Sequence, residues 1–371
     1  DEDLRADRQP EFTQIDVEAS FVDVEDILVW IQGLMSRLAM VAGIDARLPF
    51  PRLSWTEAME RYGTDRPDLR YEIEIHDWTE ATASVDLGII RSQVDAGGRV
   101  RGLHLEGGAR ISRRQIDMIE QVAKASGAPG LLWAKCSEEG TSGPLGKFLA
   151  PEHAQGMGLA PGDLALVSAG PDSLTSATLD SIRIIAAETI DLPTAREHSW
   201  LWVTDFPLFD EHNGVLAASH HPFVMPHADD IELLKTDPAQ VRGTAYDLVY
   251  NGTEFGSGSL RIHDPTLQRS VLRALGISPE EIEQKFGFLL EALAVGAPPH
   301  GGIALGVDRI VQRFTDSMSL RDVVAFPKTT AARALFEGAP TKIGTKELDD
   351  LGLMVRAKDE DEQGAEALLG D

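Results

Sequence analysis

The run from Gly301 to Arg309 (Gly-Gly-Ile-Ala-Leu-Gly-Val-Asp-Arg) constrains the fold of this chain most. It has the pattern of a glycine-interrupted strand leading into a helix whose first turn carries an arginine. The missing side chains would let a flat, charged ligand lie against the backbone, and arginine keeps its charge. Glycine-rich joints between a strand and a helix also serve plain packing, so the run alone indicates nucleotide binding only moderately.

The composition excludes several classes of protein. The 371 residues are 43% hydrophobic and 25% charged, which is ordinary for a globular chain with room for two domains. No apolar run approaches the roughly 18 residues of a membrane helix, and the single cysteine, Cys136, excludes an internal disulfide framework. A net charge of −26 argues against a generally basic surface but allows a local basic groove. We expect a cytoplasmic protein with no membrane partner.

Periodicity predicts several elements. Residues 11–18 alternate as a strand with Phe12, Gln14 and Asp16 on one face. Residues 23–41 have helical spacing, with Asp23 as N-cap and Gly43 as the stop. A second helix begins with the cap Ser278-Pro-Glu-Glu281 and runs to about residue 295. Between about 75 and 200, glycine pairs and short β-like runs predict a separate, inserted α+β segment without a catalytic constellation.

Two carboxylates flank the strongest short hairpin sequence of the chain, Asn251-Gly252. In a two-residue hairpin, residue 249 faces residue 254, which makes Asp247 and Glu254 diagonal neighbours on one face. A strand that continued through a bulge would also bring them to a common face. Two converging carboxylates suit Mg²⁺ held together with substrate phosphates. Two solvated acids on an edge hairpin are the plainer alternative.

Other polar residues near these acids suit an anionic ligand. Arg261 follows the small-residue run Gly256-Ser-Gly258, and an arginine there could grip a carboxylate or phosphate with both arms, unless it forms a structural ion pair. His220 and His221 lack further zinc ligands at usable spacing, which favours hydrogen bonding to an acidic substrate or phosphate; a buried histidine satisfied within the protein is the equal alternative for at least one of them. At the other end of the chain, an aromatic on a polar strand face, Phe12, could stack on a base.

Together these segments resemble the bacterial-type aspartyl-tRNA synthetases. Residues 1–16 are similar to the motif 2 loop and following strand of class II synthetases, and Gly301 to Arg309 to motif 3. His220-His-Pro-Phe and the run from Asn251 to His263 are similar to that family's aspartate and metal segment. The similarity extends over almost all of residues 1–345. It implies an α+β fold with an antiparallel sheet of six or seven strands flanked by helices.

The resemblance also implies roles for individual residues. Phe12 would stack on adenine opposite Arg309, Arg261 would clamp the side-chain carboxylate of aspartate, and His220 would contact the amino acid. The implied catalytic residues are Asp247, Glu254 and Arg309, and the implied Mg²⁺ ligands are Asp247 and Glu254. The implied ATP-binding residues are Asp1, Glu2, Gln9, Phe12, Glu254, Gly306, Val307, Asp308 and Arg309. The implied aspartate-binding residues are Gln14, His220, His221 and Arg261.

The resemblance predicts a domain plan and a set of partners. Residues 1–75 and 200–345 would form the two parts of the catalytic domain, and residues 76–199 the inserted domain, called GAD in the bacterial enzymes. Residues 346–371 would form an extension with a disordered, solvated tail. ATP, Mg²⁺, L-aspartate and tRNA(Asp), with tRNA(Asn) as a second acceptor, would be the ligands of a homodimer.

The chain departs from the family pattern at its start. It has no initiator Met, and the motif 2 arginine, motif 1 and the anticodon-binding barrel are not in it. We therefore expect the C-terminal part of a longer polypeptide, inactive alone. Two alternatives stay open: a synthetase paralogue that transfers the adenylate to another acceptor, and a truncated paralogue that only binds tRNA or a synthetase.

Overall fold

The computed structural model describes residues 8–355. Contacts between residues divide the chain into two compact units, Thr13–Asp316 and a smaller unit of Asp1–Phe12 with Ser317–Asp371. Each unit is described by itself. No helix among the described residues is long and apolar enough to cross a membrane.

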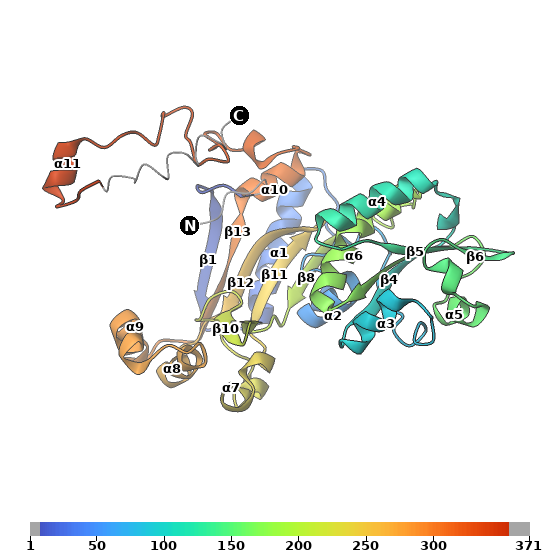
Figure 1. Cartoon of the computed structure of the whole chain (residues 1–371). Helices are drawn as coiled ribbons and strands as arrows, with labels where there is room; N and C mark the ends of the chain where they lie inside the picture. The colour runs from blue at the N-terminus through green and yellow to red at the C-terminus, as the bar shows by residue number, and fades with distance from the viewer. Residues whose placement is uncertain (1–7, 356–371) are drawn as a thin grey trace. The chain divides into compact units, whose positions relative to one another are not determined.

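The larger unit contains a six-stranded sheet in the order β1-β13-β12-β11-β8-β2 (Figure 1). Neighbouring strands are antiparallel except β2 and β8, which are parallel. The expected antiparallel sheet flanked by helices is therefore confirmed, with one parallel pair at its edge. The strands are β1 (Gln14–Ser20), β2 (Arg52–Ser54), β8 (Trp200–Thr204), β11 (Ala245–Tyr250), β12 (Thr253–Leu260) and β13 (His300–Gly306).

Helices cover both faces of this sheet. On one face, Ile27 and Leu28 of α1 (Val24–Val41) and Ile310 of α10 (Val307–Phe314) share a core with Trp202 and Leu248. On the other face, α2 and α8 contribute to a core with the alternate residues of β8 and β11. The helices on this second side are α2 (Trp55–Tyr62), α7 (Leu233–Thr236), α8 (Pro265–Ala274) and α9 (Pro279–Ala294), beside the hairpin β9 (Phe209–His212) and β10 (Val215–Ala218).

Local capping explains where the predicted helices begin. Asp23 accepts a hydrogen bond from the Asp26 N–H, and Asp26 accepts one in return, so α1 starts as expected. The same reciprocal cap links Ser278 and Glu281 at the start of α9. Past α1, Gly43 takes the left-handed conformation (φ +75°) that favours glycine and ends the helix.

A second, five-stranded sheet has the order β3-β4-β7-β5-β6. Its two hydrophobic clusters contain only residues between 71 and 192, and we call this segment the inserted module. The chain enters and leaves it side by side, because the Ala195 N–H donates to the Arg70 carbonyl (2.8 Å). The elements are β3 (Ile75–Asp77), α3 (Gly88–Asp95), β4 (Arg99–Leu105), α4 (Arg113–Ala125), β5 (Leu132–Ser137), β6 (Gly140–Ser142), α5 (Pro151–Gly156), β7 (Leu164–Gly170) and α6 (Asp172–Thr189).

In the smaller unit, Gln9 is buried and its side-chain oxygen accepts the Lys328 N–H (2.9 Å). A short helix, α11 (Thr345–Asp350), begins one residue before the extension that the sequence predicts from residue 346. The final part of the expected tail, 356–371, lies outside the described residues.

Candidate functional site

The polar face of β1 meets the glycine-rich strand β13. Gln14, Asp16 and Glu18 pair with Gly306, Ala304 and Gly302, whereas the alternate residues Ile15 and Val17 pack on the α1 core. The predicted alternation is therefore confirmed from Gln14 onward. Phe12, half-exposed, comes before the strand and belongs to the smaller unit.

The hairpin β11–β12 brings the two predicted carboxylates to one side of the sheet. Val249 pairs with Glu254 across a turn in which Asn251 and Gly252 both have positive φ (45° and 76°). The register then shifts between Leu248 and Val249. The predicted two-residue hairpin is thus confirmed, and the alternative of a strand that continues through a bulge at Asn251-Gly252 is wrong, because the bulge lies beyond the turn.

Asp247 is buried, and its Oδ1 has no hydrogen-bond partner among the described residues. Burial raises the pKa of Asp247 well above its usual value, and the negative charge of Glu254 raises it further. A buried carboxylate with an unpartnered oxygen is suited to a cation. Among residues 8–355, however, no three His, Cys, Asp or Glu side chains are grouped so as to hold a metal alone.

Arg309, in the first turn of α10, contacts Glu254 directly. Its Nη1 donates to the Glu254 carbonyl (3.1 Å) and lies 3.4 Å from the Glu254 carboxylate. The neighbouring predicted residues of the joint bind the start of β1: the Val307 N–H donates to the Thr13 carbonyl (2.9 Å), and Asp308 accepts the Thr13 N–H (3.1 Å).

The glycines of β13 serve close packing more than open space. A Cβ added at Gly301 would lie 2.6 Å from the Leu260 side chain. One added at Gly302 would lie 2.2 Å from both Glu18 Oε2 and the Val17 carbonyl. The space expected for a ligand at these two positions is therefore occupied by the protein itself, whereas Gly306 has no contact closer than 3.7 Å.

Arg261 holds a carboxylate with two nitrogens, and that carboxylate belongs to Glu18. Nε and Nη2 lie 3.3 and 3.2 Å from its two oxygens, and Nη1 donates to Ser259. The structural ion pair that the sequence left open therefore exists, and its geometry is the fork that a dicarboxylic ligand would meet. Glu18 and Ser259 were missed from the sequence, although the alternation of β1 places Glu18 on the polar face.

The two histidines, His220 and His221, have different neighbours. His220 packs edge-on against Phe206, with ring centroids 4.8 Å apart, and burial lowers its pKa. His221 Nε2 lies 3.5 Å from Arg261 Nη1. Burial, then the charges of Arg261 and His220, lowers the pKa of His221 to about 4. Both rings are therefore neutral near neutral pH and able to accept hydrogen bonds.

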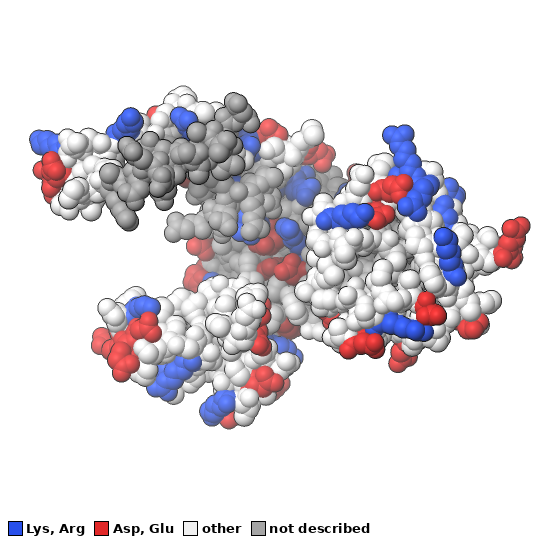
Figure 2. Space-filling view, in the orientation of Figure 1, with Lys and Arg blue, Asp and Glu red and all other residues white. Residues whose placement is uncertain are grey.

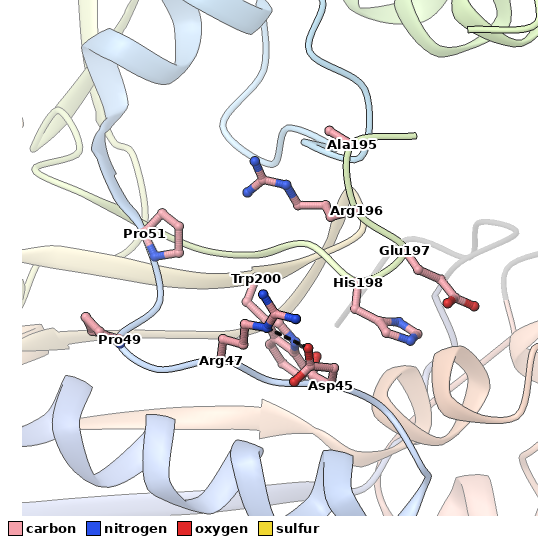
Figure 3. A pocket seen from close by; sticks show the side chains of 9 residues that line it. All are labelled: Asp45, Arg47, Pro49, Pro51, Ala195, Arg196, Glu197, His198 and Trp200. Atoms are coloured by element: carbon pink, nitrogen blue, oxygen red, sulfur yellow. Dashed lines mark hydrogen bonds and ion pairs between the residues drawn. The ribbon is translucent and has the colours of Figure 1, made fainter. Parts of the chain in front are cut away.

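A cavity of about 370 Å³ adjoins this group and is lined by Glu18, His221, Arg261 and the fully buried Gln268. The Gln268 side-chain oxygen has no partner among the described residues. A larger cavity of about 550 Å³ has Arg196, His198 and Trp200 in its wall (Figure 3). None of the predicted site residues lines it.

The remaining predicted residues fall elsewhere. Gln9 and Phe12 lie in the smaller unit, and Asp1 and Glu2 lie outside the described residues. The adenine sandwich of Phe12 and Arg309 therefore stays a prediction. On the face drawn in Figure 2, charges of both signs are mixed, with Lys and Arg gathered over α4.

Comparisons with known proteins agree with this geometry. A family model described as tRNA synthetases class II (D, K and N) matches residues 1–330. The chain is 44% identical over 368 residues to an aspartate–tRNA(Asp/Asn) ligase of Bacillus cereus (strain ATCC 10987 / NRS 248), covering 97% of this chain and 62% of that protein. It is 43% identical over 363 residues to an aspartate–tRNA ligase of Macrococcus caseolyticus (strain JCSC5402), covering 96% of this chain and 61% of that one.

The chain thus spans about three fifths of the length of these relatives. The matched residues include both parts of the six-stranded sheet and every described residue of the candidate site. The chain belongs to the class II tRNA synthetases of the D, K and N group.

Proposed function

We propose that the complete protein is an aspartate–tRNA ligase, which activates L-aspartate with ATP and transfers it to tRNA(Asp). The observation that carries this proposal is the two-nitrogen grip on a carboxylate by Arg261, which directly follows β12, the strand whose hairpin with β11 carries Asp247 and Glu254. Arginine in this geometry selects a planar carboxylate, which is the group that distinguishes the aspartate side chain from most others. The names of the similar proteins support the same activity.

The reaction needs positioning more than a side-chain nucleophile. The aspartate α-carboxylate attacks the α-phosphate of ATP, giving aspartyl-adenylate and pyrophosphate, and the terminal ribose hydroxyl of tRNA then attacks the activated carbonyl. Arg261 would hold the aspartate side chain, with His220, His221 and Gln14 around the amino acid. Arg309 would neutralise phosphate charge, while Gly306, Val307 and Asp308 keep its helix against β1.

Mg²⁺ fits the acid pair, because Asp247 Oδ1 is buried with no hydrogen-bond partner among residues 8–355 and Glu254 lies on the same side of the hairpin. When bound, the ion would neutralise charge on the phosphates of ATP. Asp1, Glu2, Gln9 and Phe12 complete the proposed ATP-binding set, and Phe12 would stack on adenine.

The partners and the domain plan belong to the same proposal. The complete protein would act as a homodimer in the cytoplasm, with residues 76–199 as an inserted domain between the catalytic parts 1–75 and 200–345. tRNA(Asn) is a second candidate acceptor, since the name of the Bacillus cereus relative includes both tRNAs.

The test is aspartate-dependent exchange of pyrophosphate into ATP by the complete protein, followed by aminoacylation of both tRNAs. Arg261→Lys keeps the charge but loses the fork, so we expect the KM for aspartate to rise at least about tenfold. Arg269→Lys is the matched control, because Arg269 pairs only with Glu283 (3.5 Å) on the described surface of α8 and α9.

Three results would separate the alternatives. Unchanged aspartate KM in Arg261→Lys contradicts the assigned grip. Exchange without charging of either tRNA favours a paralogue with another acceptor. Absence of aspartate-dependent exchange in the unmodified complete protein favours the binding-only paralogue.

A further inference from the structure

The C-terminal end of α2 lies directly against helix α6 of the inserted module. Gly63, which follows α2, has a left-handed φ of +75°, and a Cβ there would lie 2.6 Å from the Ser176 carbonyl oxygen. Tyr62, the last residue of α2, lies under the guanidinium of the fully buried Arg183 (5.1 Å). The two backbones therefore approach as closely as a glycine allows.

Arg101 of β4 forms hydrogen bonds to both helices at this contact. It is only 1% exposed, and its Nη2 donates to the carbonyls of Met59 (3.1 Å) and Glu60 (2.7 Å), at the end of α2. Its Nη1 donates to Ser176 Oγ of α6 (2.8 Å). One side chain thus joins the inserted module to two carbonyls in the last turn of α2, of which the Met59 carbonyl also accepts the Gly63 N–H (3.0 Å). A positive charge at this end of the helix is also favoured by the helix dipole.

The segment that leaves this junction, residues 63–70, leads to the candidate site. Asp68 is buried against the β11–β12 turn, because a Cβ at Gly252 would lie 3.1 Å from the Asp68 Cβ. Leu69 packs on the same core as Val249, on the sheet face that carries Asp247. Asp65, half-buried in this segment, is close enough for its charge to act on Asp247 and His220.

We propose that Arg101 is a positioning residue that fixes segment 63–70, and with it the Asp65 carboxylate, beside Asp247 and His220. The inserted module then sets the electrostatics of the site through one buried side chain. Asp65 adds a negative charge to a site that already contains Asp247 and Glu254, which favours a cationic group there. This inference rests on the proposed function for its kinetic test.

The test is a double-mutant cycle in the complete protein, measured as kcat/KM for aspartate-dependent pyrophosphate exchange. Arg101→Lys keeps the charge but cannot bridge α2 and α6 together, and Asp65→Asn removes the carboxylate at nearly constant shape. We expect each single variant to lose about tenfold or more. The double variant should lose no more than the worse single one, because both changes affect one interaction. Effects that multiply would overturn the proposal.

A second readout does not depend on activity. Hydrogen exchange at amides 63–70 should speed up in Arg101→Lys and stay unchanged in Arg113→Met, a control within the same module whose arginine lies over Trp133 (5.1 Å). Amide hydrogen exchange in Arg101→Lys that rises equally throughout the chain, or that does not rise in residues 63–70, contradicts the positioning role of Arg101. If Arg101→Lys fails to fold, Ser176→Ala, which removes one partner of Arg101, replaces it in both measurements.

The two proposals fail separately. If the unmodified protein shows no aspartate-dependent pyrophosphate exchange, the proposed function is contradicted, while hydrogen exchange at amides 63–70 still decides the role of Arg101. Normal activity together with multiplicative variants contradicts the positioning role alone.

Discussion

At the scale of single residues, the charged side chains of the candidate site form ion pairs with one another. Arg261 binds Glu18, Arg309 contacts Glu254, and His221 stays neutral beside Arg261. Each pairing fixes a side chain before any ligand arrives. At Arg261, a ligand carboxylate would have to take the place of Glu18 on the two nitrogens. The same pairings make the site sensitive to pH.

His221 should destabilise the fold in mild acid. Its pKa is about 4 in the folded protein and near 6.5 when unfolded, so between these values the unfolded chain binds more protons. Stability therefore falls as pH drops through this window. In His221→Gln, the loss in free energy of unfolding between pH 7 and about pH 5 should shrink by about 1 kcal/mol, allowing for the partial exposure of the ring.

Denaturant unfolding at the two pH values measures this difference. His212→Gln is the control, because His212 is exposed on the hairpin strand β9. An equal loss in His221→Gln and the unmodified protein would show that the ring does not carry this dependence.

At the scale of elements, what could be predicted was local. The caps of α1 and α9 and the Asn251-Gly252 turn are set by a few adjacent residues, and the structure confirms all three. The pair of Arg261 with Glu18 joins residues 243 positions apart. It depends on β1, β13 and β12 being neighbours, which no local pattern encodes. The bulge after the turn escaped prediction because the sequence does not show which residue of β12 is left without a partner in β11.

Two glycines in helix and strand should respond oppositely to alanine. A Cβ at Gly302 meets the Val17 carbonyl and the Glu18 carboxylate at 2.2 Å, and the paired backbone cannot move away. Gly302→Ala should cost about 1–3 kcal/mol of stability. Gly33, inside α1, has nothing within 4 Å, so Gly33→Ala should stabilise by about 0.5–1 kcal/mol.

Thermal unfolding of both variants checks the pair. Small and equal shifts in melting temperature for the two variants would mean that β1 and β13 can move apart enough to accept a methyl group at residue 302.

At the scale of the whole molecule, the two sheets differ in how the chain supplies them. The six-stranded sheet takes strands from residues 14–20, 52–54 and 200–306, whereas the core of the inserted module comes from residues 71–192 alone. A contiguous core is the property expected of a unit that folds by itself.

Residues 71–192 expressed alone should therefore unfold in one cooperative transition. Residues 196–316 should not, since they lack β1, β2 and α1, which complete the other core. Far-UV circular dichroism against temperature measures both fragments. A broad, non-cooperative change in 71–192 would show that the module needs the contacts of Arg101 with α2 in order to fold.

The hydrogen bond between Ala195 and Arg70 has a consequence for the order of folding. Pairing β2 with β8 brings Arg52 beside Trp202 and closes a long loop. Once the inserted module has formed, its two ends are already together, and the chain left to close is only roughly 25 residues. The free-energy cost of closing the loop, which is entropic, then falls by about 1–2 kcal/mol. The inserted module separates β2 from β8 in the sequence, but once folded it would hold the chain segments that lead to these two strands close together.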